Sequence, residues 1–213
     1  MQTWPWEPGI CGGMHKIIEG MVALAIEKGV VINTGEAVEH IEVHNGRAHA
    51  VNTTKGIYEA DVVVAGADYH HVEQQLLAPG YRNYSEKYWQ SRQMAPSSLL
   101  FYLGINKKLD NLLHHNLYFD KDFDTHAREI YETPAWPSNP LFYVSCTSKT
   151  DPTCAPEGME NLFILMPVAP GLKDEPSVRE RYYDILINRL EYLSVKKSGR
   201  MRFSTNLMRT MIS

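Results

Sequence analysis

The stretch GGMHKIIEGMVALAIEKGVVI, residues 12–32, decides how the first part of the chain is interpreted. Two glycines precede a segment whose apolar residues recur at helical spacing, and Gly29 follows that segment as a glycine commonly follows a helix. VVINTG (30–35) then has the composition of a short buried strand. The stretch therefore predicts a helix that leads directly into a strand, as in α/β proteins. Only eleven residues precede this unit, which favours a piece of a larger protein.

The next residues predict an antiparallel meander. Asn45-Gly46 is a strong hairpin signal because both residues tolerate positive φ, and the segments on either side alternate apolar and polar residues. Lys55-Gly56 predicts a second turn. ADVVVAGA (60–67) is a continuous apolar run, too short for a helix and rich in β-branched residues, which favours a strand buried on both faces.

The remaining chain has a different pattern, so we predict a domain change near residue 70. Residues 69–95 favour helix. Four apolar and aromatic runs, at 97–106, 114–120, 140–148 and 160–170, predict strands of a largely antiparallel, mixed sheet. A last helix is predicted at 176–193, with Val178, Tyr182, Ile185, Leu186 and Leu190 at core spacing.

Composition excludes several classes of protein. The net charge of -4 gives no general attraction to nucleic acid. Three cysteines leave at least one unpaired and form no CxxC motif, which favours a reduced, cytoplasmic setting. We recognise no signal peptide and no apolar run long enough to span a bilayer, so a soluble protein or one lying on a membrane surface is expected.

Two places could approach a cofactor. The amides at Gly12 and Gly13, before a helix, could face an anionic or polar group, or the pair could simply turn the chain into the helix. The predicted strand that ends in AGAD (65–68) is small enough for a flat ligand or a diphosphate to pass, or it could pack under a helix.

The side chains point to no metal site and to no identified catalytic residue. The nine histidines include adjacent pairs whose side chains diverge, and no HExxH or GxSxG motif occurs. Aromatic and methionine residues between 94 and 166 could line a tunnel for a long apolar substrate or could pack in a core. They are Phe101, Tyr102, Tyr118, Phe119, Trp136, Phe142, Tyr143, Phe163 and Met166.

The order of these motifs resembles the phytoene desaturase family, the bacterial carotenoid desaturases related to the flavin amine oxidases. The resemblance lies in GGMHKIIEGMVALAIEKGV (12–30), in AVEHIEV (37–43) with the NGRA turn, in EADVVVAGADYHHVEQQLL (59–77), and in the segments that follow up to residue 193. It covers about nine-tenths of the chain.

The resemblance implies part of a two-domain FAD-binding flavin oxidoreductase fold, α/β at first and α+β later. Residues 1–69 would form part of the FAD-binding domain and residues 70–193 a substrate domain with a mixed sheet. Val38 would meet the adenine end of FAD, and Gly12, Gly13, Ala67 and Asp68 would lie near the cofactor. The implied reaction is the dehydrogenation of a carbon–carbon single bond in a carotene. The resemblance implies that the carotene is drawn from a membrane surface, the inner face of the cell membrane.

The chain also departs from the family. It has no GxGxxG motif for the pyrophosphate, and residues 194–213 form a basic segment with no acidic residue that is expected to be unstructured or out of frame. We therefore expect an internal segment that is inactive alone and whose binding of FAD is doubtful. The alternatives are a non-enzymatic remnant that binds apolar ligands or a membrane, or a related flavin enzyme such as a carotenoid isomerase, a retinol saturase-like enzyme or an amine oxidase.

Overall fold

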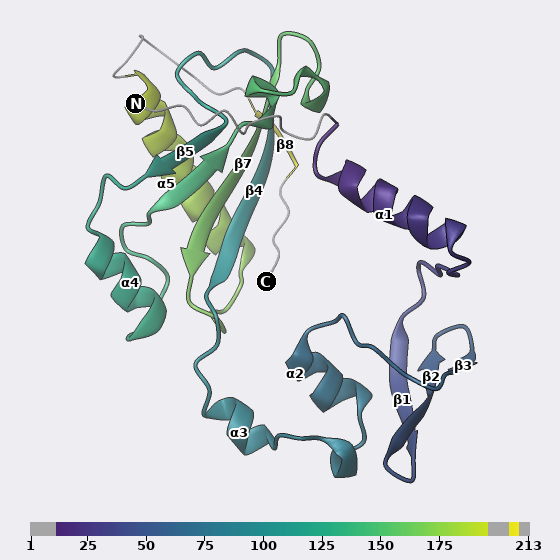
Figure 1. Ribbon diagram of the computed structural model, residues 1–213. Helices are drawn as coiled ribbons and strands as arrows, with labels where there is room; N and C mark the ends of the chain where they lie inside the picture. The colour runs from purple at the N-terminus through teal and green to yellow at the C-terminus, as the bar shows by residue number, and fades with distance from the viewer. Residues whose placement is uncertain (1–11, 196–204, 209–213) are drawn as a thin grey trace, which may run out of the picture. The chain divides into compact units, whose positions relative to one another are not determined.

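The computed structural model describes residues 12–195 and 205–208. The chain divides into two compact units. The sheet unit comprises residues 94–213 together with 1–22, and the meander unit comprises residues 23–93. Each unit is described by itself below, with the elements labelled as in Figure 1.

The sheet unit contains a five-stranded sheet with the spatial order β5-β6-β7-β4-β8. All of its strand pairs are antiparallel. The longest pair places Ser97 opposite Val168 and Ile105 opposite Glu160. The four strands expected between residues 97 and 170 are all present, which confirms the interpretation of those runs. The strands are β4 (Ser97–Ile105), β5 (His115–Tyr118), β6 (Phe142–Ser145), β7 (Glu160–Val168) and β8 (Thr205–Met208).

One face of this sheet carries the main core. Along β7 the side chains alternate between buried and half-buried, as a strand with one covered face requires. Helix α5 (Pro176–Val195) covers the buried face, and Tyr183 on α5 contacts Phe101 on β4 with ring centroids 5.7 Å apart. The predicted core positions of this helix are confirmed, because Tyr182, Leu186 and Leu190 are buried and Val178 and Ile185 pack against the same cluster.

A shorter helix, α4 (Phe123–Tyr131), lies between β5 and β6 in the sequence and was not predicted. Asp122 caps its first turn by accepting a hydrogen bond of 2.7 Å from the Thr125 amide. Two 3₁₀ turns, η3 (Thr147–Lys149) and η4 (Pro152–Cys154), shape the loop between β6 and β7.

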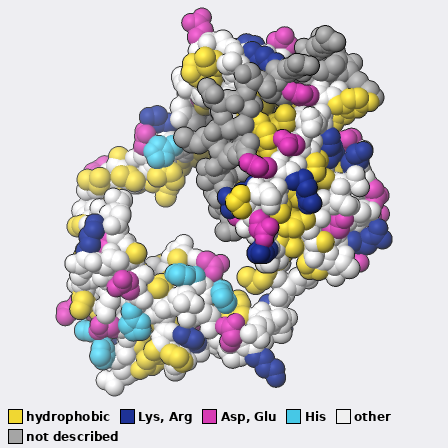
Figure 2. Space-filling view, turned by 180° about the vertical axis from the view of Figure 1, so that it is seen from behind, with side chains coloured by type: hydrophobic (Ala, Val, Ile, Leu, Met, Phe, Trp, Pro, Cys, Tyr) yellow, Lys and Arg dark blue, Asp and Glu magenta, His cyan; other side chains and the backbone are white. Residues whose placement is uncertain are grey.

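Helix α1 (His15–Glu27) confirms the helix predicted after the glycine pair. It is followed by Gly29 with φ +82°, the left-handed conformation expected after a helix. None of its residues is buried, and Met21, Leu24 and Ile26 expose 64%, 55% and 60% of their surface. Figure 2 shows hydrophobic side chains gathered along this helix.

The meander unit contains β1 (Val38–His44), β2 (Arg47–Thr53) and β3 (Ile57–Glu59), paired antiparallel in that order. Asn45 and Gly46 both have positive φ, which confirms the predicted hairpin. The buried apolar core of this unit is small. It consists of Ile41, Val72 and Leu76, with Val43, Ala48, Val63 and Leu77 packed against them.

Two predicted strands are wrong for this structure. Residues 30–35 and 60–67 are irregular, and no strand pairs with either segment in the described part of the chain. Val31 and Val64 expose 81% and 88% of their surface. A strand requires a continuous ladder of backbone hydrogen bonds to a neighbour, and a single bond, such as that of 2.9 Å from the Ala60 amide to the His49 carbonyl of β2, does not provide one.

Residues 69–93 form short helical pieces in place of a longer helix. These are α2 (Tyr69–His71), the π-turn η1 (Val72–Leu76), η2 (Pro79–Tyr81) and α3 (Glu86–Gln90). The side chain of Glu73 is fully buried and accepts hydrogen bonds from the amides of Asn83 (2.8 Å) and Tyr84 (3.2 Å) and from the hydroxyl of Tyr69 (3.1 Å). This buried carboxylate joins the start of the segment to residues ten positions later.

Residues on both sides of position 70 pack together in the meander unit, and the predicted domain boundary at that position stays a prediction. The basic segment 194–213 was expected to be unstructured. Most of it lies outside the described residues, but Thr205–Met208 form β8 and pair with β4. Within the described residues, no helix has both the length and the hydrophobicity needed to cross a bilayer.

Candidate functional site

The glycine pair has the backbone geometry that the sequence suggested, but one of its amides is already satisfied. Gly12 and Gly13 have φ values of +88° and +81° and lie just before α1. The Gly12 amide donates a hydrogen bond of 2.8 Å to Oδ2 of Asp151, in the loop between β6 and β7. A carboxylate of this chain therefore occupies the position at which a bound anion would be expected.

Asp151 is also held by its own loop. Its Oδ1 accepts hydrogen bonds from the hydroxyl (2.6 Å) and the amide (2.9 Å) of Thr153. The Thr153 hydroxyl and then the Gly12 amide lower the pKa of Asp151 to about 2, because both interactions favour the ionised carboxylate. Asp151 is therefore a charged anchor between this loop and the glycine turn.

The other three predicted cofactor residues belong to the meander unit. Val38 is the first residue of β1 and pairs with Thr53. Ala67 lies at the end of the irregular segment, and Asp68 caps α2 through a hydrogen bond of 2.9 Å from the His71 amide. Neither unit by itself contains all five predicted residues, so their assignment to one cofactor site stays a prediction.

The residues present do not by themselves fit FAD. One glycine amide is satisfied by Asp151, the carboxylate of Asp68 serves as a helix cap, and a Cβ added at Gly13 would meet open space in place of a closely fitting cradle. A diphosphate needs several free amides or cationic side chains around it. We therefore derive no chemical step through a flavin held by these residues alone.

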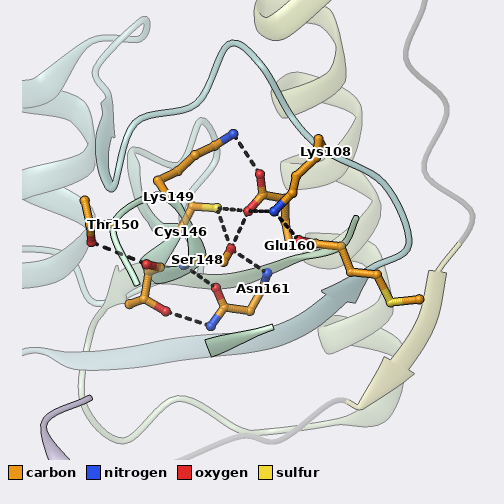
Figure 3. A network of polar contacts seen from close by, with 9 residues as sticks. Lys108, Cys146, Ser148, Lys149, Thr150, Glu160 and Asn161 are labelled. Atoms are coloured by element: carbon orange, nitrogen blue, oxygen red, sulfur yellow. Dashed lines mark hydrogen bonds and ion pairs between the residues drawn. The ribbon is translucent and has the colours of Figure 1, made fainter. Parts of the chain in front are cut away.

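A buried carboxylate organises the base of the same loop (Figure 3). Glu160, the first residue of β7, is 2% exposed and lies 2.8 Å from Lys149 and 3.8 Å from Lys108. The Ser148 hydroxyl donates to the same carboxylate, and the thiol of Cys146 contacts it at 3.6 Å. Lysine charges and hydrogen bonds together offset the cost of burying this anion.

Asn161 extends this network along the loop. Its side-chain oxygen accepts a hydrogen bond of 3.0 Å from the Ser148 amide, and its side-chain nitrogen donates to the Thr147 hydroxyl at 2.7 Å. Burial opposes ionisation of Glu160, but the hydrogen bonds from Lys149 and Ser148 outweigh it and hold the pKa of Glu160 below its ordinary value. The arrangement fixes the start of the loop that carries Asp151.

Burial raises the pKa of the Cys146 thiol, and the neighbouring Glu160 carboxylate acts in the same direction. A buried thiol beside an anion is a poor nucleophile, so Cys146 contributes here to the packing around Glu160.

The sheet face opposite α5 presents a row of rings, here called the open face. Tyr102 on β4 lies 5.2 Å from Phe163 on β7, and Phe163 lies 6.4 Å from Tyr143 on β6, between ring centroids. The Tyr143 hydroxyl contacts Nδ1 of His115 on β5. Tyr102 is 41% exposed, and Tyr143 and Phe163 are half-buried. The open face therefore offers a mainly apolar, aromatic wall.

The aromatic and methionine residues that could line a tunnel or pack in a core fall into three groups in the structure: buried, packed against the core, and partly exposed. Phe101, Phe142 and Met166 are buried in the core under α5. Tyr118 and Trp136 pack against that core. The remaining members, Tyr102, Phe119, Tyr143 and Phe163, retain exposed surface.

Known proteins resemble this chain over most of its length. It is 40% identical over 172 residues to the carotenoid 3,4-desaturase of Haloarcula japonica, a match that covers 80% of this chain and 34% of that protein. It is 33% identical over 179 residues to the zeta-carotene-forming phytoene desaturase of Myxococcus xanthus, covering 81% of this chain and 34% of the relative. Over this segment, the chain is homologous to the carotenoid desaturases.

Relatives with another named reaction occur in the same group. The chain is 32% identical over 190 residues to the 4,4'-diaponeurosporene oxygenase of Staphylococcus haemolyticus, covering 86% of this chain and 37% of that protein. The chain thus spans about a third of the length of the curated relatives it matches, in agreement with the segment expected from the sequence. No protein-family profile matches the chain.

Solved structures support the fold of the desaturase homologue. An oxidoreductase from Methanosarcina mazei superposes with a TM-score of 0.60 at 17% identity, covering 94% of this chain and 43% of that protein. Reduced UDP-galactopyranose mutase gives a TM-score of 0.50 at 14% identity, covering 87% of this chain and 35% of that protein. These likenesses confirm the mixed helix-and-sheet fold expected from the sequence.

Sequence reasoning missed Asp151 and Glu160 in this desaturase homologue. Asp-Pro-Thr at 151–153 has the pattern of an aspartate that caps a turn, which could have indicated a structural role for Asp151. Nothing in the local sequence links Asp151 to Gly12, because the two residues are 139 positions apart. The burial of Glu160 likewise depends on Lys108, which lies in a distant loop.

Proposed function

We propose that this sequence is the middle segment of an FAD-dependent carotenoid desaturase of carotenoid biosynthesis, and that it is not active alone. The complete enzyme would remove two hydrogens from adjacent carbons of a carotene and so convert a single bond into a double bond, with FAD as the expected hydrogen acceptor. The observation that carries the proposal is the 40% identity to a carotenoid 3,4-desaturase over 80% of this chain. The apolar open face supports it.

In this proposal the open face forms part of the wall along the substrate. The rings of Tyr102, Tyr143 and Phe163 would pack against the hydrocarbon chain, exclude water and orient the chain through its flat shape. The loop fixed by Glu160 and Asp151 would hold the glycine turn in place. An apolar carotenoid, taken from the surface of a membrane on its cytoplasmic side, is the substrate class that such a wall suits.

A segment exchange tests the proposal. The matching segment of the Haloarcula japonica desaturase would be replaced by residues 12–193 of this chain, and the chimera would be expressed with that enzyme's carotenoid substrate. We expect a product two hydrogens lighter, detected by chromatography and mass spectrometry. Phe163→Asp in the chimera should abolish conversion because it places a charge on the apolar wall, whereas Phe163→Leu should retain it.

The outcomes separate the candidate reactions. A chimera that folds and binds FAD but leaves the carotenoid unchanged would overturn the desaturase proposal. A product that has gained oxygen would instead favour the reaction named for the Staphylococcus haemolyticus relative.

A separate test asks whether the 213-residue chain alone retains FAD, which the proposed reaction would require. The chain would be mixed with FAD, desalted and examined by visible absorption. We expect no retained flavin band, because the described residues provide no diphosphate cradle. A flavin that survives desalting would contradict this part of the proposal.

A further inference from the structure

An apolar pocket lies between α4 and the strands β5, β6 and β7, and we call it the α4 pocket. Its volume is about 250 Å³. Its walls come from helix α4, from the strands β5, β6 and β7, and from two flanking residues, Phe119 after β5 and Leu141 before β6. The lining residues are Leu117, Phe119, Phe123, His126, Ala127, Ile130, Tyr131, Leu141, Phe142, Tyr143, Leu165 and Pro167.

The one histidine in the wall has no ring nitrogen left for a ligand. His126 is 3% exposed. Its Nδ1 accepts a hydrogen bond of 3.0 Å from the Leu141 amide, so Nε2 carries the proton and donates to the Pro167 carbonyl at 2.9 Å. The same contacts satisfy the backbone groups of Leu141 and Pro167. A polar ligand would therefore lose hydrogen bonds to water and gain none from the histidine.

The mouth of the pocket exposes large apolar side chains. Leu117, Phe119 and Phe123 are 65%, 59% and 61% exposed, and the two phenylalanine rings lie edge to face with centroids 6.3 Å apart. Single exposed apolar residues are ordinary, but a group of them around an apolar hollow is typical of a binding site. The pocket and its mouth form one continuous apolar surface on the sheet unit.

The volume bounds the ligand. Engineered apolar cavities of about 150 Å³ bind benzene, so about 250 Å³ admits a hydrocarbon group somewhat larger than a benzene ring. Aliphatic and aromatic side chains line the pocket together, so its wall matches a hydrocarbon chain that carries no polar group. We propose that the α4 pocket binds the branched hydrocarbon end of an isoprenoid chain, and so holds one end of the substrate. This assignment rests on the proposed function for its natural ligand.

The test uses the full 213-residue chain and farnesene, an acyclic isoprenoid hydrocarbon. The chain would be incubated with farnesene, separated by gel filtration, and analysed by gas chromatography for bound hydrocarbon. We expect saturable binding that falls at least tenfold in Ala127→Phe, because the new ring fills the pocket. Ala135→Phe is the matched control, since Ala135 is exposed and does not line the pocket.

A second variant guards against misfolding of the first. Leu117→Asp places a charge at the exposed mouth, where water solvates it, so the fold should be retained while hydrocarbon binding falls. Circular dichroism and thermal melting would establish which variants are folded. Folded Ala127→Phe and Leu117→Asp variants that bind farnesene like the unmodified chain would overturn the proposal, as would an unmodified chain that retains none.

This readout is independent of the proposed enzymatic function, because it requires neither flavin nor desaturation. If the chain binds farnesene but the chimera is inactive, the pocket assignment stands and the proposed desaturase function is overturned. If the chimera is active but the chain does not bind farnesene, the desaturase function stands and the pocket assignment is overturned.

Discussion

In the sheet unit, α5 buries Tyr182, Leu186 and Leu190 against apolar side chains from several strands, whereas the apolar cluster of the meander unit has three buried members, Ile41, Val72 and Leu76. The meander unit compensates in part with the hydrogen bonds around the buried carboxylate of Glu73. Apolar burial contributes in proportion to area, so the two units should differ strongly in stability.

The difference shows what an apolar sequence pattern records. Helix α1 and the segment 60–67 are also rich in apolar residues, yet most of these side chains are exposed. An apolar pattern marks side chains that can be buried, but it does not contain the surface that buries them. In β7 that surface is α5, which the chain itself supplies.

The largest effect is expected from Leu186→Ala, which removes a fully buried side chain of α5. The variant should lose about 2–5 kcal/mol of the free energy of unfolding of the sheet unit, from lost transfer energy and from the cavity left behind. Met21→Ala in α1 is the control, because Met21 also belongs to the sheet unit. Met21 is 64% exposed, so its change should stay within about 0.5 kcal/mol.

Hydrogen exchange read by mass spectrometry, peptide by peptide, distinguishes the units. Peptides from β4 and β7 should lose protection in Leu186→Ala, while peptides from β1 and β2 should be unchanged. Equal losses in both sets would contradict the division into two units.

Much of the sheet unit was predictable from the sequence, because each pattern matches one element. The apolar run at 160–170 predicts β7 and helical spacing in 176–193 predicts α5, while in the meander unit Asn45-Gly46 predicts the hairpin. These features depend on neighbours along the chain. Helix α4 was missed although Phe123, Ala127 and Ile130 recur at helical spacing after the capping residue Asp122, because the pattern spans nine residues and is easily read as part of a loop.

The candidate site was less predictable, because its contacts join distant residues. The glycine turn before α1 was expected, but its partner Asp151 was not. Likewise, no sequence pattern near Glu73 or Glu160 indicates that these carboxylates are buried. Such burial depends on donors from Tyr69, Asn83, Ser148 and Lys149, and only the fold brings these together.

Glu73→Gln tests whether the carboxylate stabilises the meander unit. The amide that replaces the carboxylate cannot accept on both sides, so one or more buried donors lose their partner at a cost of about 1–3 kcal/mol. Exchange in peptides covering 69–84 should accelerate, with the sheet unit unaffected. Glu39→Gln, at an exposed position of the same unit, is the control and should leave exchange unchanged. Unaltered protection in Glu73→Gln would mean that the three apolar residues suffice.

Glu160 should make the sheet unit sensitive to acid. Its folded pKa lies below the ordinary value of 4.5, so its contribution is complete above that value and is lost as the pH falls through the folded pKa. We expect unfolding curves of the unmodified chain to show lower stability below about pH 4.5. Glu160→Gln should be less stable by about 1–2 kcal/mol at neutral pH and should show a smaller dependence on acid. An identical acid dependence in both proteins would assign the effect to other carboxylates.

The smallest effect is expected at two glycines in the turns of the meander unit. Gly46 has φ +77°, whereas Gly56 lies outside the left-handed region, and an added Cβ meets open space at both positions. Gly46→Ala should therefore cost about 1 kcal/mol through backbone strain alone. Gly56→Ala has no such strain and should be neutral or slightly stabilising, because alanine restricts the unfolded chain. Exchange in peptides from β1 and β2 measures both variants. If they behave alike, the hairpin conformation contributes nothing to the stability of this unit, and Glu73 with its small apolar core must account for all of it.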